Sequence, residues 1–554
     1  MRKVRQIDHA PQGGDCDRRG HLGRQSGVPM TETGSVLDAL RRGHERVPAY
    51  WFLCGLLLAL SAVPLFVGLY PPFIDYPSHL GRIAMLADWN ASAFVREHYQ
   101  ISSWLLANLS LEMVMLPLSK VMPAEVAGDL FILITFALLL FGTVTLHRTL
   151  FGKRSMWPLV SAAWLYNWIV LYGFLNYVFG VAVMLWCLAA YLRLSERAWW
   201  IRVSAGMCFT LVLFLCHLFA VALYAFAIAG FELQRFLLTW HRERRLDWQR
   251  LVIGAAQFIP AMLTYVAISP TRSITARPFI YNFPLKWASL LVTFTSGNVI
   301  MDGLTIAFFV GAAVVLIRRA NIEISEKFIG ALIGLVIALV VAPRTVQHPG
   351  PAFVDIRVPL ALVFTSIAAT RVTFRSPLVA QRAAAIFGAY LVLKIAVISA
   401  SALEYREVVH GYLAAFNRLE RGSTLFAARQ QLDDSFLRRF YVDRILSPRH
   451  ADAFAVIRRE VFVPGVFATP GGQPIQVRPR FQPLKVAQGD EPVEVRDASA
   501  LAGFISEVER LQRSVAPGKA AYLLMQDRGE VMALPASAEV VATGPGFRLA
   551  KIGR

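Results

Sequence analysis

The chain has 554 residues, of which 56% are apolar and only 17% are charged. Soluble domains are roughly 45–50% apolar and about 25% charged, so the composition excludes an ordinary soluble enzyme and indicates a polytopic membrane protein. The 56 Lys and Arg residues outnumber the 37 Asp and Glu residues and give a net charge of +19. No RNA- or DNA-binding motif accompanies this excess, which cationic cytoplasmic loops explain better than nucleic-acid binding.

The N-terminal 48 residues are polar, basic and rich in glycine, as is typical of a disordered tail. The apolar run that follows them is longer than the hydrophobic region of a signal peptide. We therefore expect a cytoplasmic tail over residues 1–48 and an uncleaved first membrane span directly after it.

Apolar runs of the ~17–25 residues that cross a ~30 Å hydrocarbon core recur up to residue 402. One run, 201–234, is too long for a single span and is expected to turn near His217, which makes two spans of it. With a shorter run at 357–370, eleven spans are expected in a transmembrane domain over 49–402. The other expected spans are 49–70, 125–147, 156–172, 174–192, 250–268, 300–317, 327–343 and 382–402.

Two further apolar segments, 101–118 and 286–297, are ambiguous. Cytoplasmic loops carry an excess of Lys and Arg, and the strongest cationic clusters all fall on one side of the membrane only if neither segment is a span. We therefore expect both to be amphipathic helices on the outer face, where Glu112 suits an interfacial helix better than a span. The N-terminus is then cytoplasmic, and both the long first loop 71–124 and the C-terminus are external.

Residues 403–554 combine helix-like stretches, short strand-like stretches such as "AYLLMQ" and loops rich in Pro and Gly. This mixture predicts a small external α+β domain. The expected fold class is therefore a mainly α polytopic helical bundle with interfacial helices in the first external loop and a small α+β C-terminal domain. Because that domain has few long apolar runs, we expect it to depend on docking against the loop 71–124.

The motifs of common soluble catalysts and of metal sites are missing from the sequence. It has no P-loop, no HExxH, no G-x-S-x-G and no dinucleotide fingerprint. The five cysteines lack metal-ligand spacing, so neither a structural zinc nor a disulfide framework is expected. The spans are nearly free of acidic residues, with Lys394 and His217 as the ionisable exceptions within or near them, which argues against an ion-coupled transporter.

Polar chemistry gathers instead on the external loops. The side chains concerned are Asp75, His79, Arg82, Arg272, Arg277, Arg344, His348, Asp355 and Arg357. A carboxylate can accept a proton from an acceptor hydroxyl, and arginines can hold a phosphate or pyrophosphate leaving group through bidentate hydrogen bonds.

Plainer roles for these residues stay open. Asp75 can be the N-cap of the helix that follows it. His79 and Arg82 share one face of that helix and can contact lipid headgroups, and Arg357 can anchor a span.

The stretch "IDYPSHLGRI" (74–83) resembles the D-x-P-x-H-L-x-R pattern of a group of bacterial membrane proteins. Three other stretches resemble the same group: "YNWIVLYGFLNYVFG" (166–180), "CHLFAVALY" (216–224) and "VDIRVPL" (354–360). In layout, residues 49–410 resemble the GT-C superfamily of polytopic glycosyltransferases. Those enzymes have a first span, a long external loop with a catalytic acid and interfacial helices, a multi-span body and often an external C-terminal domain.

The resemblance implies that Asp75 is a catalytic base and that the donor is a polyprenyl-phosphate sugar. It also implies that groups on the external loops bind the substrates, for which the candidates are His79, Arg82, Arg272, Arg277, His348, Asp355 and Arg357. Many members of the superfamily carry paired acids in the first loop, whereas here Tyr76 follows Asp75 and the next acid is Asp88. This departure weakens the case for a metal, so no metal or cofactor is expected, and it leaves open a non-catalytic member.

The expected function is transfer of a sugar from the polyprenyl-phosphate donor to a lipid or polysaccharide acceptor on the outer face of the bacterial inner membrane. The expected partners are that donor, the lipid or glycan acceptor and membrane lipids, without nucleic acid. One alternative is a non-catalytic transporter or an assembly partner in envelope polysaccharide export, and another is a lipid-linked oligosaccharide ligase or polymerase. An enzyme needs Asp75, Arg272 and Arg357 to converge on one cavity, whereas a transporter needs a polar path through the bundle.

Overall fold

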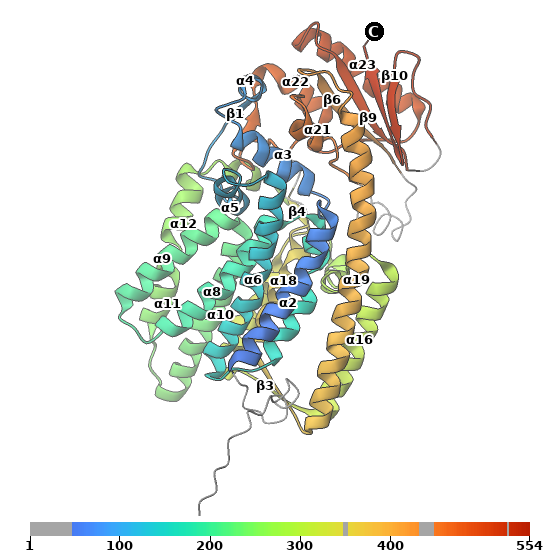
Figure 1. Cartoon of the computed structure of the whole chain (residues 1–554). Helices are drawn as coiled ribbons and strands as arrows, with labels where there is room; N and C mark the ends of the chain where they lie inside the picture. The colour runs from blue at the N-terminus through green and yellow to red at the C-terminus, as the bar shows by residue number, and fades with distance from the viewer. Residues whose placement is uncertain (1–46, 347–352, 432–447, 529–530, 554) are drawn as a thin grey trace, which may run out of the picture.

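A computed structural model describes residues 47–346, 353–431, 448–528 and 531–553. A helical bundle carries a smaller α+β unit at one end (Figure 1). Helices dominate the bundle because a helix satisfies its backbone hydrogen bonds internally, as a hydrocarbon environment requires of apolar runs such as these. The predicted mainly helical class and the small C-terminal sheet region are confirmed.

Among the described residues, seven helices are long and apolar enough to cross a membrane, so the chain is a multi-pass membrane protein. They are α2 (Val47–Gly68), α6 (Ala124–Phe151), α8 (Leu175–Leu194), α9 (Trp199–Cys216), α10 (Leu218–Glu243), α16 (Val299–Arg319) and α19 (Pro377–Phe416). One further pair of segments is bent by 43° at a short break and makes an eighth span if it is counted as one. Its first half is α11 (Trp248–Ala256), and its second half consists of α12 (Ile259–Leu263) and η2 (Thr264–Ile268).

The expected number of eleven spans is higher than the number of helices that meet these criteria. The three shorter segments are η1 (Trp157–Trp164) with α7 (Trp168–Tyr172), α17 (Ile329–Val341) and α18 (Val358–Ala369). With 13 and 12 residues, α17 and α18 extend over roughly 18–20 Å, which is short of a ~30 Å core. Apolar content alone did not show these interruptions. Asn167 caps a new helix, α7, inside the expected span 156–172. Short 3-10 turns precede α17 and α18 and shorten these two helices.

The predicted turn near His217 is confirmed. This residue ends α9 in an extended conformation, and its Nδ1 accepts the backbone N–H of Phe219 at 3.1 Å at the start of α10. The side chain therefore caps the second of the two helices formed by the long apolar run, in the way that polar N-cap residues do.

Charged groups inside the bundle contact other protein groups. Glu232 of α10, an acid within an expected span, accepts hydrogen bonds from the Tyr191 hydroxyl at 2.6 Å and from Arg202 at 3.1 Å. Lys394 of α19 donates to the Ala163 carbonyl at 2.8 Å. These contacts join neighbouring helices and offset the cost of placing charge among apolar side chains.

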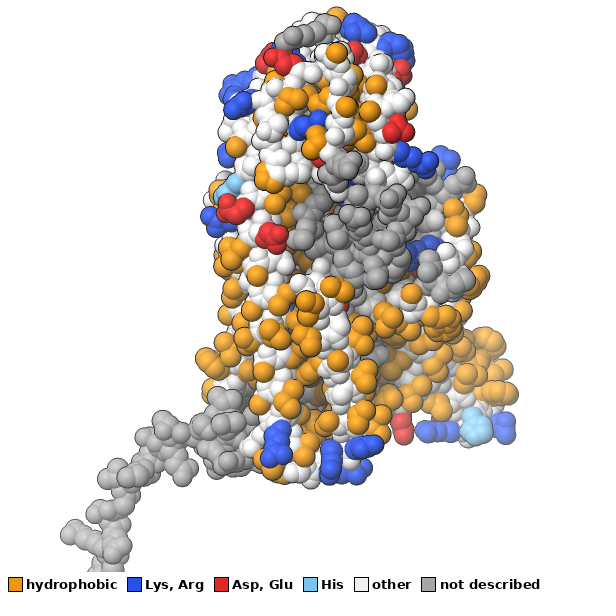
Figure 2. Space-filling model, turned by 90° about the vertical axis from the view of Figure 1, so that its right-hand side faces the viewer, with side chains coloured by type: hydrophobic (Ala, Val, Ile, Leu, Met, Phe, Trp, Pro, Cys, Tyr) orange, Lys and Arg blue, Asp and Glu red, His pale blue; other side chains and the backbone are white. Residues whose placement is uncertain are grey.

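The end of the bundle opposite the α+β unit is cationic. There, the antiparallel strands β3 (Ala320–Ile324) and β5 (Thr370–Phe374) continue from α16 and α18, next to Arg318, Arg319 and Arg371. Figure 2 shows Lys and Arg side chains at this end, below a broad belt of hydrophobic side chains. The belt and the charged end have the distribution expected of a membrane protein with cationic cytoplasmic loops.

The first loop after α2 is more buried than expected. It contains α3 (Tyr76–Ala87), α4 (Ala93–His98), β1 (Tyr99–Ile101) and α5 (Ser110–Leu118). Of the segment 101–118 only α5 is helical, and its Glu112 is 1% exposed. The second ambiguous segment, 286–297, likewise holds only the end of α14 (Phe283–Lys286) and the short α15 (Ala288–Val292).

The C-terminal unit is built on a five-stranded sheet with strand order β10-β11-β9-β6-β8. Strand β6 pairs in parallel with β8 and β9, whereas β9, β11 and β10 are antiparallel. The expected boundary at residue 403 lies inside α19, which continues out of the bundle to Phe416. The strands are β6 (Thr424–Gln430), β8 (Val493–Val495), β9 (Ala521–Gln526), β10 (Glu539–Gly544) and β11 (Phe547–Ile552), and the helices are α21 (Ala453–Arg458), α22 (Gln482–Gln488) and α23 (Ala498–Val515).

The C-terminal unit docks on the first loop. Strand β1 pairs with β7 (Ile475–Val477), and the Tyr99 hydroxyl donates to the Val463 carbonyl at 3.0 Å. The His98 ring lies 5.0 Å from the Phe462 ring and 4.5 Å from the Phe481 ring, measured between centroids. These contacts make the first loop and the C-terminal unit one packed body at the same end of the bundle.

Candidate active site

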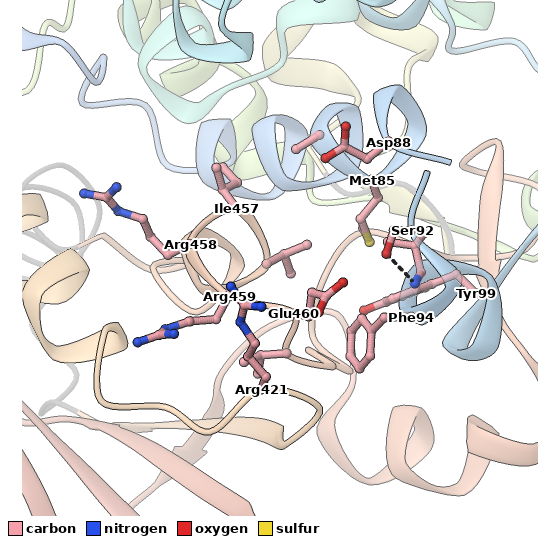
Figure 3. Close-up of a pocket in the computed structure, with 14 residues that line it drawn as sticks. Met85, Asp88, Ser92, Phe94, Tyr99, Arg421, Ile457, Arg458, Arg459 and Glu460 are labelled. Atoms are coloured by element: carbon pink, nitrogen blue, oxygen red, sulfur yellow. Dashed lines mark hydrogen bonds between the residues drawn. The ribbon is translucent and has the colours of Figure 1, made fainter. Parts of the chain in front are cut away.

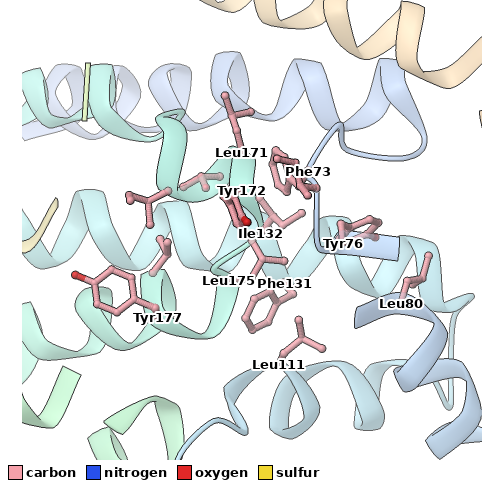
Figure 4. Packing of buried hydrophobic residues seen from close by; sticks show 14 of the residues in the cluster. Phe73, Tyr76, Leu80, Leu111, Phe131, Ile132, Leu171, Tyr172, Leu175 and Tyr177 are labelled. Carbon is pink, nitrogen blue, oxygen red and sulfur yellow. The ribbon is translucent and has the colours of Figure 1, made fainter. Parts of the chain in front are cut away.

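Asp75 lies where the segment before α3 contacts the end of α7. Its backbone N–H donates to the Tyr172 carbonyl at 3.1 Å, and that of Ile74 donates to the Leu171 carbonyl at 2.9 Å. Gly173 has φ +99°, and a Cβ there would lie 2.7 Å from the Cβ of Asp75, so only glycine fits. Figure 4 shows this junction, with Phe73 beside Leu171 and Tyr172.

The carboxylate of Asp75 does not cap a helix. The residue precedes α3 but has helical dihedral angles, φ −87° and ψ −7°, and its side chain makes no capping hydrogen bond. Its Oδ1 lies instead 3.6 Å from Nε2 of His450, which comes from the C-terminal unit. Since His450 is 2% exposed and Asp75 is 9% exposed, the two groups face each other in a largely buried site.

His450 follows a cationic residue of the same unit, Arg449. Arg449 forms ion pairs with Glu491 and, at 3.7 Å, with Glu494. The charge of Arg449 also interacts with Asp75 and with the Tyr172 hydroxyl. Sequence reasoning missed His450 and Arg449 because neither belongs to a recognisable motif.

The surroundings of Asp75 set its protonation. Burial raises the pKa of its carboxyl, and the neighbouring His450 and Arg449 oppose that rise. Glu491 adds a smaller upward contribution, and the net result is a pKa above the ordinary value for Asp. A carboxylate with a raised pKa is a stronger base, which suits a group that accepts a proton from a hydroxyl.

Arg357 is the predicted binding residue that shares this site. It lies just before α18 and is 8% exposed, with its guanidinium carbon 3.9 Å from the centroid of the Phe174 ring. Its backbone carbonyl accepts a hydrogen bond from the Tyr177 hydroxyl at 2.6 Å, and its charge interacts electrostatically with the Asp75 carboxyl and the Tyr172 hydroxyl. Cation–π contact fixes the position of the guanidinium without neutralising it.

His79 and Arg82 form a buried network with Glu112, which we call the first-loop network. Arg82 donates from Nε to Glu112 Oε1 at 2.7 Å and from Nη2 to His79 Nδ1 at 3.1 Å. The proton of His79 is therefore on Nε2, which donates to the Gly173 carbonyl at 3.2 Å. Burial, and next the charge of Arg82, hold the pKa of His79 well below its ordinary value.

The first-loop network occupies both His79 and Arg82, which were candidates for substrate binding. Arg82 pairs with Glu112 and not with Asp75, because both partners are buried between α3 and α5. His79 uses both ring nitrogens in contacts with protein groups, one of which is the glycine that abuts Asp75. These two residues therefore position the turn that carries Asp75, and neither ring nitrogen of His79 is left to bind a substrate.

Arg272 and Arg277 do not take part in the contacts around Asp75. Both side chains are exposed, and Arg272 bonds to the Val266 carbonyl just before its own short helix, α13 (Thr271–Thr275). The charged groups that act on Asp75 are instead those of the C-terminal unit and Arg357. Of the three residues expected to converge on one cavity, Asp75 and Arg357 interact electrostatically, and their convergence on a cavity stays a prediction.

Asp355, the remaining candidate within the described residues, lies near Phe353. Asp355 is fully buried and accepts a hydrogen bond from Arg344 at 3.2 Å, while the Arg344 guanidinium lies 5.0 Å from the Phe353 ring centroid. The Phe353 ring in turn lies 5.4 Å from the Tyr172 ring. Asp355 therefore supports the wall of the site through Arg344 and two aromatic rings, and His348 lies outside the described residues.

Comparison with known proteins gives weak likenesses. No family model matches the chain, and no curated protein matches its sequence. Among solved structures, it is similar to the arabinofuranosyltransferase AftD from Mycobacteria, with a TM-score of 0.38 and 14% identity over 91% of this chain. It is also similar to ArnT from Cupriavidus metallidurans bound to undecaprenyl phosphate, with a TM-score of 0.36 and 15% identity over 90% of this chain.

The chain spans 41% of the length of AftD and 98% of that of ArnT. Likenesses at these TM-scores identify neither the activity nor the ligand of this chain. The function has to be inferred from the residues around Asp75.

Proposed function

We propose that this protein is a GT-C-like membrane glycosyltransferase that moves a sugar from a polyprenyl-phosphate donor to a hydroxyl of a lipid or polysaccharide acceptor. The observation that carries the proposal is the buried Asp75 carboxylate, 3.6 Å from His450 and in electrostatic contact with Arg357 and Arg449. A carboxylate beside several cations matches the needs of a reaction in which a hydroxyl loses a proton while a phosphate leaves.

In the proposed reaction Asp75 accepts the proton of the acceptor hydroxyl. The hydroxyl oxygen forms a bond to the anomeric carbon of the donor sugar as the bond from that carbon to the phosphate oxygen breaks. The electron pair of the broken bond stays with the polyprenyl phosphate, which leaves as the anion. The proton is then released from Asp75, which restores the carboxylate for the next turnover.

Arg357 and Arg449 are the cations available to stabilise the leaving phosphate. The Arg357 guanidinium contacts the Phe174 ring and interacts electrostatically with Asp75. Arg449 also forms ion pairs with Glu491 and Glu494, and both arginines are candidates for the phosphate contact. An arginine suits this task because its planar guanidinium matches the geometry of phosphate oxygens.

His450 is a positioning residue in this account. Its Nε2 side faces the Asp75 carboxylate and lowers the pKa of that group. It therefore favours the ionised form of Asp75 and opposes the effect of burial, which favours the neutral acid. Because His450 and Arg449 come from the C-terminal unit, the site is complete only when that unit is docked.

The proposed location is the bacterial inner membrane, with Asp75 on the outer side. The cationic end that carries β3 and β5 then faces the cytoplasm, since cytoplasmic loops are enriched in Lys and Arg. Helix α3, which Asp75 directly precedes, and the C-terminal unit lie at the opposite end of the bundle (Figure 1). A donor carried by a polyprenyl chain reaches this position from the outer leaflet.

The proposal is tested by following the donor lipid. Membrane lipids from wild-type cells, a deletion strain and an Asp75→Asn strain are extracted and their polyprenyl-phosphate sugars measured by mass spectrometry. We expect the same glycosylated lipid to accumulate in the deletion and Asp75→Asn strains because its consumption is blocked. Unchanged polyprenyl-phosphate sugars in the deletion strain would contradict the proposed donor.

A further inference from the structure

A cavity separate from Asp75 lies between the first loop and the C-terminal unit. It has a volume of about 370 Å³, and its walls come from α3, α4 and β1 on one side and from α21 and the residues after it on the other. This volume falls in the lower part of the roughly 300–1,000 Å³ range of small-molecule sites. Figure 3 shows the cavity, whose lining does not include Asp75.

Three arginines give one wall of the cavity a positive charge. Arg421 and Arg458 are exposed and, within the part of the chain that the structure describes, form no ion pair. Arg459 donates from Nη2 to the Asn417 carbonyl at 2.6 Å, and its buried Nε has no hydrogen-bond partner among the described residues. These guanidinium groups retain donors for an anion, and arginine forks bind carboxylates and phosphates bidentately.

The wall opposite the arginines offers a carboxylate and aromatic rings, from Asp88 at the end of α3 and from Phe94 and Tyr99. A second carboxylate, Glu460, follows Arg459 on the arginine side, and neither acid forms a salt bridge between described residues. In Figure 3 the Asp88 carboxylate lies across the cavity from the guanidinium groups of Arg458 and Arg459. Ionised carboxylates accept hydrogen bonds from hydroxyls, and aromatic side chains supply apolar surface to the flat faces of a ligand.

The cavity lies close to the membrane surface and at a fixed distance from Asp75. The charge of Arg458 acts on the Tyr70 hydroxyl, two residues beyond the end of α2. Asp75 precedes α3 and Asp88 follows it, and a helix of 12 residues is roughly 18 Å long. A ligand that reaches from the cavity to Asp75 must therefore be longer than one sugar unit.

We propose that this cavity binds an acidic unit, bearing a carboxylate or a phosphate, of an extended glycan acceptor. The arginines bind the anionic group, while Asp88 and Glu460 accept hydrogen bonds from sugar hydroxyls. A neutral glycan leaves the arginines without a partner, and a simple anion leaves the carboxylates without donors. This inference rests on the proposed glycosyl transfer and adds to it the chemical class of the acceptor.

The test measures binding without the donor lipid. Purified full-length protein in detergent is titrated with digalacturonic acid, glucose 6-phosphate and the neutral disaccharide cellobiose, and binding is followed by thermal shift and calorimetry. We expect at least one of the two acidic sugars to bind, and the Arg421→Gln/Arg458→Gln double variant to bind it about tenfold or more weakly. The double variant Arg510→Gln/Arg513→Gln removes two exposed charges of α23 and should bind as wild type does.

Several outcomes would overturn this inference. If cellobiose binds as tightly as the acidic sugars, the arginines do not select an anionic group. Unchanged binding of the acidic sugar to the Arg421→Gln/Arg458→Gln variant would contradict the role of the arginines in the same way. Saturation of the arginines by phosphatidylglycerol vesicles, with no effect of either sugar, would assign them to lipid headgroups. Because the Asp75→Asn protein should still bind the acidic sugar, a failure of this inference is separate from a failure of the proposed transfer reaction.

Discussion

Oδ1 of Asp75 lies 3.6 Å from Nε2 of His450, although the first residue follows the first membrane helix and the second belongs to the C-terminal unit. The contact joins the two ends of the chain at one buried site. Its consequence is that the protonation of Asp75, and with it the proposed chemistry, depends on the docking of the C-terminal unit.

The first prediction concerns the pH dependence that His450 imposes. His450 lowers the pKa of Asp75, so His450→Gln should raise that pKa and reduce the ionised fraction at neutral pH. Since the ionised form is the active base, the acid limb of the pH–rate profile should move to higher pH, and the rate should recover in alkaline solution. Arg449 remains beside the site and limits the size of the shift because it still lowers the pKa of Asp75, whereas Glu491 still raises it.

The control for this prediction is His410→Gln, which changes an exposed histidine of α19. Its pH–rate profile should match that of the wild type. A His450→Gln protein that loses rate equally at every pH would show that His450 does not act through the charge of Asp75.

The second prediction concerns the buried pair of Arg82 and Glu112. The two side chains are 0% and 1% exposed, and Arg82→Met leaves the Glu112 charge without its partner. We expect the free energy of unfolding to fall by about 3–5 kcal/mol, as measured by denaturant titration in detergent. The double variant Arg82→Met/Glu112→Leu should be more stable than the Arg82→Met protein, since it removes the unpaired charge as well.

A matched surface pair provides the comparison for this measurement. Glu507 and Arg510 form an exposed ion pair on α23, and Arg510→Met should change stability little because water screens exposed charges. Equal losses at the buried and the exposed pair would contradict the role assigned to the first-loop network.

The third prediction tests the turn that holds Asp75. Gly173 has φ +99° and its Cα faces Asp75, so Gly173→Ala should cost about 1–3 kcal/mol in backbone strain and displace the carboxylate. Transfer activity should fall by more than the loss of folded protein explains. Gly503 of α23 has open space around it, and Gly503→Ala should leave activity and folding unimpaired.

The fourth prediction concerns topology. In a cysteine-free background, Gln100→Cys and Arg480→Cys should react with a membrane-impermeant thiol reagent added to cells with a permeabilised outer membrane. Leu246→Cys, in an exposed loop after α10, should react only after the inner membrane is opened. Protection of both external positions in intact inner membranes would contradict an external first loop and C-terminal unit.

The sequence predicted the parts of the fold that depend on local composition. The long apolar helices, the turn at His217 and the position of Asp75 after the first helix follow from apolar runs and one short motif. Helices that end early were not predictable in the same way, because α18 ends after 12 residues where β5 begins, and β5 pairs with the distant strand β3.

The candidate site was predictable only in part because its residues meet through tertiary contacts. The sequence singled out Asp75 and Arg357, which share the site. His450 and Arg449 carry no local signal, and their relation to Asp75 arises from the docking of β7 and α21 on the first loop. Similarly, Glu112 pairs with Arg82 across α3 and α5, a contact that no local sequence pattern indicated.

The most direct test of the account is Asp75→Asn. The Asp75 side chain makes no capping hydrogen bond, so an isosteric amide should fold normally while it removes the proton acceptor, a group worth about 10²–10⁴ in rate. Asp497→Asn is the matched control, because Asp497 caps α23 and Asn caps about as well as Asp.

The measurement compares envelope glycans from cells that carry each variant with those from wild-type and deletion strains. The account predicts that the Asp75→Asn protein is present at the wild-type level and melts at the wild-type temperature. When expressed in the deletion strain, it should nevertheless fail to restore the wild-type glycans. Asp497→Asn should restore them. If Asp75→Asn restores wild-type glycans in cells whose deletion alters them, Asp75 is not the base and the proposed reaction is contradicted.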